Sequence, residues 1–252
     1  MCVDEKCDTQ RGMANAFTER LSGYAPLSDA DVSLLADSCR NVRDVPTGHH
    51  LIYEGDSPDP VFVMLEGWAC GYKMLPDGGR QILAFLLPGD FCDIHIAVLK
   101  AMDHSIVTIT QAKVASLPRL QMEALVEARP TISRAFWWSQ LVDQGVLRAW
   151  IVSMGRRKAE ERVAHLMCEL YIRLRNIGLA TDDQCDMPLT QLVIADAVGL
   201  TPVHVNRVLR KLRLANVMEL RAGSLTIIDP VRLACIAGFD DNYLHGRLQR
   251  VA

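Results

Sequence analysis

The stretch GLTPVHVNRVLRKLR, residues 199–213, joins a turn glycine, a helix start and a run of basic side chains. Thr201 is a residue type that caps helices, and Pro202 suits the first helical turn. Apolar residues then recur at helical spacing and predict one buried face. These are Val205, Val208, Leu209 and Leu212. The other face either carries solvated basic side chains or contacts a polyanion.

The charge around this helix favours a polyanion. Residues 201–221 hold five basic residues and one acidic residue, a local net charge of +4 in a chain of net charge −3. Such an excess is a candidate phosphate footprint. Arg207 can bond guanine O6 and N7, Asn206 can reach an adenine edge, and His204 can touch a base or a phosphate. The predicted DNA-contacting residues are Thr190, Thr201, Val203, His204, Asn206, Arg207, Arg210 and Lys211.

The neighbouring segments predict the domain that positions this helix. A charged helix precedes it at 156–174, a shorter helix follows from about Thr190 to Ala197, and a turn at 198–200 leads into the basic helix. Two strands are predicted next, at VMEL and LTII, and the turn RAGS between them would make the pair a wing. This order predicts a winged-helix DNA-binding domain over 156–235, followed by a C-terminal tail over 236–252.

The N-terminal half predicts a different architecture. Residues 17–45 have a helical pattern, and short strands separated by Gly, Pro and Asp follow to about residue 120. The expected strands are 51–56, 61–67, 81–90 and 105–117, and PDGG at 76–79 is a plausible hairpin turn. Strands of this length predict an antiparallel β-roll or barrel over 17–125. The fold class is therefore α+β.

A long helix is predicted between the two halves, within a segment spanning 126–155. Two neighbouring rows of side chains run along it at alternating spacings of four and three, the pattern of a coiled coil. One row holds Phe136, Gln140, Asp143, Leu147, Trp150 and Met154, and the other holds Trp137, Leu141, Gln144, Arg148 and Ile151. One row can pack on its own roll and the other on a twin helix. We predict a homodimer through Phe136, Leu147, Trp150, Ile151 and Met154, the alternative being a helix buried in a monomer.

Composition sets the remaining limits. The 252 residues suffice for one large domain or two smaller ones, and half of them are hydrophobic, as in globular proteins. Residues 1–16 lack the apolar core of a signal peptide, and no apolar run reaches membrane-span length. The eight cysteines, at 2, 7, 39, 70, 92, 168, 185 and 235, form no CxxC pair and read as reduced thiols. We expect a cytoplasmic protein without membrane association.

Together these segments resemble the cyclic-AMP receptor protein and fumarate–nitrate regulator (CRP/FNR) family of bacterial transcription factors. The resemblance covers roughly residues 17–230 and rests on motifs in the family's order: HLIYEGD, VFVMLEGWACGYKMLPDGGRQILAFLLPGDF, MGRRKAEERVAHLMCEL and IADAVGLTPVHVNRVLRKL. It implies an effector-sensing, cyclic-nucleotide-binding-like β-roll, a dimerisation helix, a DNA reader and contact with RNA polymerase. At the family's recognition positions Arg207 is retained, whereas Val203 stands where a glutamate is common.

The effector site departs from the nucleotide-binding pattern of the family. Where those members have Gly-Glu-Leu and then Arg-Ser, this chain has Asp93, Ile94 and His95 and then His104-Ser105. An aspartate at a phosphate-binding turn adds a like charge to an anion site. We therefore predict no cyclic-AMP binding and an unknown effector. The candidate pocket residues are Cys92, Asp93, His95, His104, Ser105 and Arg148.

No cofactor is predicted. The oxygen-sensing branch needs four cysteines for a [4Fe–4S] cluster, and this chain has only Cys2 and Cys7 before Cys39. Cys92 with the nearby histidines can suit zinc, haem iron or thiol redox chemistry, or Cys92 is a small buried hydrophobe. Two other function classes stay open. One is a cupin-like metal enzyme, and the other is a dimeric scaffold that does not read DNA.

Overall fold

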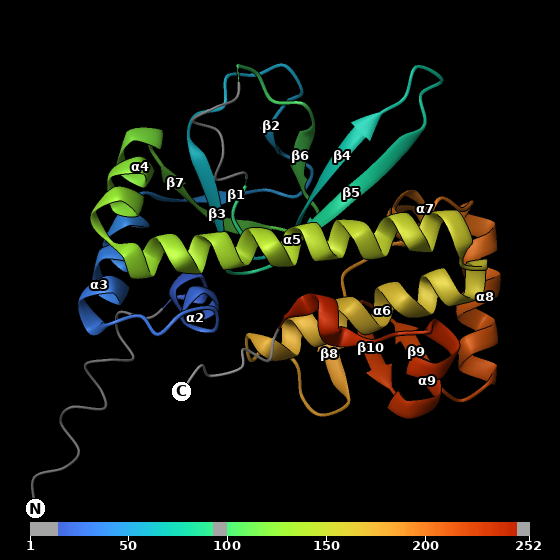
Figure 1. Ribbon diagram of the computed structural model, residues 1–252. Coiled ribbons are helices and arrows are strands. Elements are labelled where there is room, and N and C mark those ends of the chain that lie inside the picture. Colours follow the sequence, from blue (N-terminus) through green and yellow to red (C-terminus); the bar gives the residue numbers. More distant parts are fainter. Residues whose placement is uncertain (1–14, 93–99, 246–252) are drawn as a thin grey trace, which may run out of the picture. The chain divides into compact units, whose positions relative to one another are not determined.

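The computed structural model describes residues 15–92 and 100–245, drawn as ribbon in Figure 1. The chain forms two compact units: Met1–Gly71 with Phe85–Gln140, and Tyr72–Ala84 with Leu141–Ala252. The predicted domains 17–125, 126–155 and 156–235 remain sequence-based predictions.

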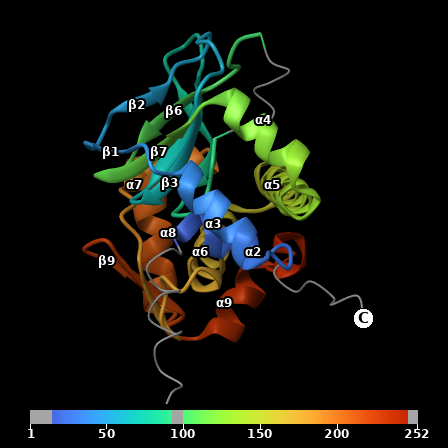
Figure 2. The ribbon, with the colours of Figure 1, turned by 90° about the vertical axis from the view of Figure 1, so that its left-hand side faces the viewer.

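Two short helices begin the first unit. Helix α2 (Ala16–Ser22) starts at Asn15 and α3 (Asp29–Ser38) at Ser28, and both N-termini carry a reciprocal capping box. The predicted helical segment 17–45 is thus two helices followed by a strand. Helix α2 lies against strand β3, as Figure 2 shows, and buries Phe17 and Leu21 completely.

The strands form two sheets in the β-roll. Their bounds are β1 Val42–Val45, β2 His50–Ile52, β3 Val61–Glu66, β4 Ala69–Met74, β5 Arg80–Leu86, β6 Ser105–Thr108 and β7 Ala112–Leu117. One sheet has the order β1-β7-β3 and the other β2-β6-β4-β5. Strand β7 pairs antiparallel with both neighbours, Val63 and Val42 both lying opposite Ala115. The predicted strand 105–117 is two strands in different sheets.

The roll is held by an apolar core and one buried ion pair. Phe17, Phe91 and Phe136 contact one another edge-on or tilted, with ring centroids 5.3–6.0 Å apart. Arg20 lies 2.6 Å from Asp90, with side chains only 6% and 9% exposed. Each buried charge has lost its hydration shell and is stabilised by its partner, so removing either residue would leave the other charge buried and unpaired.

The predicted hairpin turn at 76–79 is confirmed. The backbone N–H of Leu75 donates to the Gly79 carbonyl (2.7 Å), and Gly78 takes a φ of +84°, a left-handed conformation that favours glycine. Arg80, at the start of β5, donates to Asp196 of helix α7 (2.7 Å). These residues belong to the second unit, so the hairpin is part of the same compact body as α7.

The remaining elements are mainly helical. Their bounds are α4 Arg119–Ala128, α5 Pro130–Arg156, α6 Ala159–Asn176, β8 Gln184–Asp186, α7 Gln191–Val198, α8 Pro202–Leu214, β9 Met218–Arg221, β10 Ser224–Ile227, α9 Pro230–Ala237 and the 3-10 turn η2 Asp241–Leu244. The two predicted wing strands pair as β9 and β10, and β8 adds a third strand in the order β8-β10-β9. No strand is predicted at β8 from the sequence.

The predicted α+β class is confirmed, with a β-roll, the long helix α5 and a winged helix (Figure 1). The predicted tail begins inside α9 and includes η2, which contacts α6. Among the described residues no single helix has the length and apolarity to cross a bilayer, and the bent pair α7 and α8 meets that test only by combined length and composition.

Candidate nucleic-acid interface

Helices α7 and α8 form a helix-turn-helix. Thr190 caps α7 by accepting from the Val193 N–H (3.2 Å), and Thr201 caps α8 by accepting from the His204 N–H (3.3 Å). Gly199 ends α7 at φ +64°, and the two helices are bent by 100°. This is the angle expected for the motif, so the turn at Gly199 fixes the direction in which α8 starts.

Helix α8 has one buried and one exposed face. Val205, Val208 and Leu212 are buried, and α8 packs on α6, α7 and β9. The exposed side chains Val203, Asn206, Arg207 and Arg210 follow spacings of three and four, so they share one face, with His204 beside it. Six of the eight predicted DNA-contacting residues thus lie exposed along α8 itself, and the two threonines lie at the N-termini of α7 and α8.

The basic residues of this region divide into paired and unpaired groups. Lys211 forms an ion pair with Glu160 of α6, and Arg213 lies 3.9 Å from Glu219 of β9. Arg207, Arg210 and Arg221 have no ion-pair partner within residues 15–92 and 100–245. The local charge excess is therefore concentrated on the exposed face of α8 and at the wing. Lys211, predicted from sequence to contact DNA, is engaged within its own chain.

The wing places one of these arginines at its tip. Strands β9 and β10 are joined by Ala222 and Gly223, both at positive φ (+51° and +78°). The turn leaves Arg221 exposed, and Arg221 pairs with Ser224 in the antiparallel register. A guanidinium on such a tight turn can reach a phosphate.

Thr201→Ala is expected to lower the free energy of unfolding by about 1 kcal/mol, because α8 loses its N-cap. Thr201→Ser keeps the hydroxyl acceptor and should retain the stability. Denaturant titration measures this effect. The base preference of Thr201→Ala should match that of the unchanged protein. An altered preference with unchanged stability would assign Thr201 to base contact instead.

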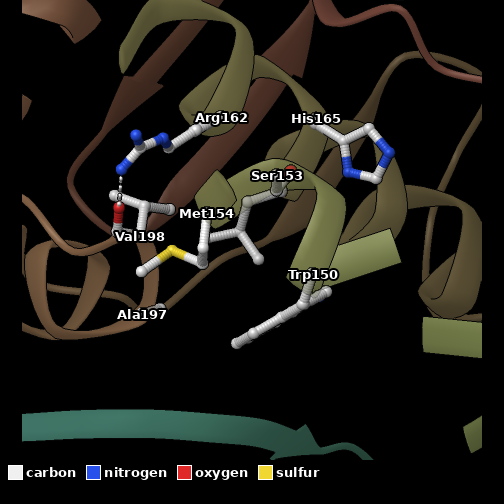
Figure 3. Close-up of a pocket in the computed structure, with 8 residues that line it drawn as sticks. Trp150, Ser153, Met154, Arg162, His165, Ala197 and Val198 are labelled. Carbon is white, nitrogen blue, oxygen red and sulfur yellow. Dashed lines mark hydrogen bonds between the residues drawn. The ribbon is translucent and has the colours of Figure 1, made fainter. Parts of the chain in front are cut away.

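A small cavity lies behind the helix-turn-helix. It has a volume of about 10 Å³ and is lined by Trp150, Ser153, Met154, Arg162, His165, Leu166, Ala197 and Val198. Figure 3 shows the Met154 side chain reaching toward Val198, whose carbonyl accepts from Arg162 (3.2 Å). This volume holds no more than about one water, so the contacts there support the turn and leave no room for an effector.

A buried carboxylate connects three elements of the second unit. Glu169 of α6 is fully buried and accepts from Trp150 Nε1 of α5 (3.1 and 3.2 Å) and from the Tyr243 hydroxyl of η2 (2.8 Å). Arg173 lies 3.8 Å away. Burial raises the pKa of Glu169, while Arg173 and the two hydrogen bonds oppose the rise. Sequence reasoning missed this group, because a lone Glu on an amphipathic helix carries no signal of burial.

The burial of side chains along α5 differs from the predicted dimer face. Phe136 is 1% exposed in the roll core, and Trp150 is 9% exposed against Glu169, so both are buried in their own chain. Met154 is half-buried beside the turn at Gly199, where an added Cβ would lie 2.5 Å from Met154 Cε. The exposed apolar side chains are Trp137, Leu141, Leu147, Ile151 and Val152. These five, called here the α5 seam, include Leu147 and Ile151 of the predicted set.

The predicted effector residues fall in several environments. Cys92 is 2% exposed, His104 Nδ1 lies 2.8 Å from Asp103, and the Ser105 hydroxyl accepts from the Glu54 N–H (2.9 Å). Arg148 is exposed on α5. Asp93 and His95 lie outside the described residues, as do Cys2 and Cys7.

Within residues 15–92 and 100–245 no three His, Cys, Asp or Glu side chains are arranged to hold one metal ion. Burial raises the pKa of Cys39 to about 11, of Cys168 to about 12 and of Cys185 to about 11, so these thiols stay protonated.

Comparison with known proteins now identifies both halves. Residues 42–129 match the cyclic nucleotide-binding domain and residues 161–236 the Crp-like helix-turn-helix domain. The nitrogen fixation regulation protein FixK of Bradyrhizobium diazoefficiens is 30% identical over 191 residues, 76% of this chain and 79% of that protein. The transcriptional activatory protein AadR of Rhodopseudomonas palustris is 30% identical over 236 residues, 94% and 95% of the two chains.

A solved structure supports the same fold. FixK2 from Bradyrhizobium japonicum superposes with a TM-score of 0.70 at 23% identity, over 79% of this chain and 98% of that one. The relatives are transcription regulators and not enzymes, so the prediction of a regulator, over a cupin-like enzyme, is confirmed. The chain belongs to the CRP/FNR family of DNA-binding transcriptional regulators.

Proposed function

We propose that this protein is a sequence-specific regulator that binds a two-fold symmetric operator as a homodimer. The observation that carries the proposal is the exposed face of α8, where Asn206, Arg207 and Arg210 lie beside one another and both arginines lack an ion-pair partner in the described chain. In helix-turn-helix proteins the N-terminal residues of the second helix contact base edges in the major groove.

The side chains divide into base readers and phosphate contacts. Arg207 reads guanine through O6 and N7, and Asn206 reads adenine through N6 and N7. Arg210, one turn farther from the start of α8, and Arg221 on the wing contact phosphates. Thr190 and Thr201 use their oxygen lone pairs as caps and keep a hydroxyl hydrogen to donate to a phosphate.

The homodimer is proposed to form through the α5 seam. Large apolar side chains stay exposed along one face of this helix, Trp137 and Ile151 at 71% each. Large apolar side chains that stay exposed on one face of a helix mark an interaction surface. Pairing with the same helix of a second copy makes an isologous contact, and the resulting two-fold axis matches a palindromic operator.

Cyclic AMP is not the proposed effector. His104 stands where nucleotide-binding members have an arginine, and its ring contacts the Asp103 carboxylate, which brings negative charge near a phosphate site. The Ser105 hydroxyl already accepts a hydrogen bond from the backbone N–H of Glu54. Calorimetry with cyclic AMP tests this point, and a micromolar dissociation constant would contradict it.

We further propose that the protein acts in the cytoplasm and contacts RNA polymerase. Relatives are named transcriptional activators, including FnrL of Cereibacter sphaeroides, which is 25% identical over 218 residues. An activator must contact the transcription machinery as well as its operator. The direction of regulation depends on where the operator lies relative to the promoter.

Selection of bound duplexes from a random-sequence pool tests the proposal. Enrichment of an inverted repeat with half-sites about one DNA turn apart is expected. A pool that stays unenriched while the protein remains folded and dimeric would instead favour a scaffold.

Arg210→Ala should flatten the salt dependence of operator binding. Each lost phosphate contact lowers the slope of log affinity against log salt by about 1. Lys211→Ala should change the slope less, because Lys211 is paired with Glu160. Fluorescence anisotropy between about 50 and 200 mM salt measures both slopes. Equal losses for the two variants would mean that the Glu160 pair opens on DNA.

A further inference from the structure

We infer that Val203 reads the C5-methyl group of a thymine in each half-site. This inference rests on the proposed function and specifies part of the sequence that α8 recognises. Val203 is the second residue of α8, is 64% exposed, and lies on the same face as Asn206, Arg207 and Arg210.

Neither folding nor helix propensity accounts for valine at this position. Its side chain adds nothing to the buried face, which consists of Val205, Val208 and Leu212. Valine has a lower helix propensity than alanine or the long polar residues, and an exposed isopropyl group orders water. A partner that covers this side chain would remove that cost.

The chemistry of the major groove identifies the partner. Valine has no donor or acceptor, so it cannot bond guanine, cytosine or adenine edges. Thymine alone among the four bases presents a methyl group in that groove, and apolar side chains contact it. A polar base edge placed against Val203 would lose its hydration without a new hydrogen bond.

The helix geometry limits where this thymine lies. Val203 and Arg207 are separated by four residues, so their Cβ atoms lie roughly 5–6 Å apart. Base pairs are stacked about 3.4 Å apart. The thymine is therefore within about two base pairs of the guanine that Arg207 reads, on either strand.

Uracil substitution tests the inference, because deoxyuridine differs from thymidine only by the methyl group. Each thymine of the selected half-site is replaced in turn by deoxyuridine and the affinity is measured. Burying one methyl contributes about 0.8 kcal/mol, which is about fourfold in affinity. Replacement in both half-sites should therefore cost about 16-fold at one position near the guanine.

Two variants make the test specific. Val203→Ala should bind thymine and uracil at that position equally, whereas Val231→Ala, an equal truncation of an exposed valine on α9, should keep the full discrimination. Val203→Glu should shift the preferred base from thymine to cytosine, whose N4 amino group donates to a carboxylate.

The outcomes separate this inference from the proposed function. Absence of any sequence preference in the unchanged protein overturns the proposed function. Sequence-specific binding that is indifferent to uracil at every thymine overturns only the inference, as does discrimination that persists in Val203→Ala. In that case Val203 faces another partner, such as a protein.

Discussion

Ile151→Asp is expected to convert the proposed homodimer into a monomer and to remove tight operator binding. Ile151 is 71% exposed in the single chain and lies near the C-terminal end of the α5 seam. Truncating a buried Ile or Leu costs about 2–5 kcal/mol, or roughly 30-fold to several thousand-fold in the dimer dissociation constant. A carboxylate adds desolvation and repulsion, because the symmetry places the change in both copies.

Light scattering measures the species present, and anisotropy measures operator binding. Leu120→Asp is the matched control, since Leu120 is 75% exposed on α4 and lies outside the seam. It should stay dimeric and bind DNA. An unchanged dimer in Ile151→Asp would move the interface to another surface.

Glu169→Ala is expected to destabilise the second unit by about 3–5 kcal/mol. The substitution removes the acceptor shared by Trp150 and Tyr243 and the buried carboxylate beside Arg173. Helices α5, α6 and the η2 turn lose the group that joins them. Glu169→Gln keeps the side-chain volume and one acceptor oxygen, so this variant should lose less stability than Glu169→Ala.

Hydrogen exchange measures this effect unit by unit. Amides of α6 should lose protection in Glu169→Ala, whereas those of β3 and β7 should keep theirs. The control is Glu160→Ala on the same helix, since its ion pair with Lys211 is exposed and contributes about 1 kcal/mol or less. Equal protection in Glu169→Ala and Glu160→Ala would mean that the Glu169 carboxylate is dispensable.

Local signals predicted the helix-turn-helix accurately. Thr190, Thr201, Pro202 and Gly199 all act through their immediate neighbours, as caps and a left-handed turn. The hairpin at 76–79 is a local turn of the same kind. Such elements are predictable because their physics is contained within a few consecutive residues.

Features that depend on distant residues were not predictable. Strand β8 is three residues long and exists because Cys185 lies opposite Leu225 of β10. The two heptad-spaced rows of α5 are equivalent in sequence, and only tertiary packing buries Phe136 and Trp150. Lys211 and its partner Glu160 are 51 positions apart, and no local sequence pattern around either residue predicts the ion pair.

The measurement that most directly tests base reading by α8 is the specificity ratio of Arg207→Ala. The ratio compares affinity for the selected operator with affinity for a scrambled duplex of the same length. Loss of a bidentate guanine contact should lower operator affinity by about 1–3 kcal/mol per half-site, or roughly 5- to 150-fold. Affinity for the scrambled duplex should fall much less, and preference at one base pair of each half-site should relax. A ratio that stays at the value of the unchanged protein would contradict base reading by this helix.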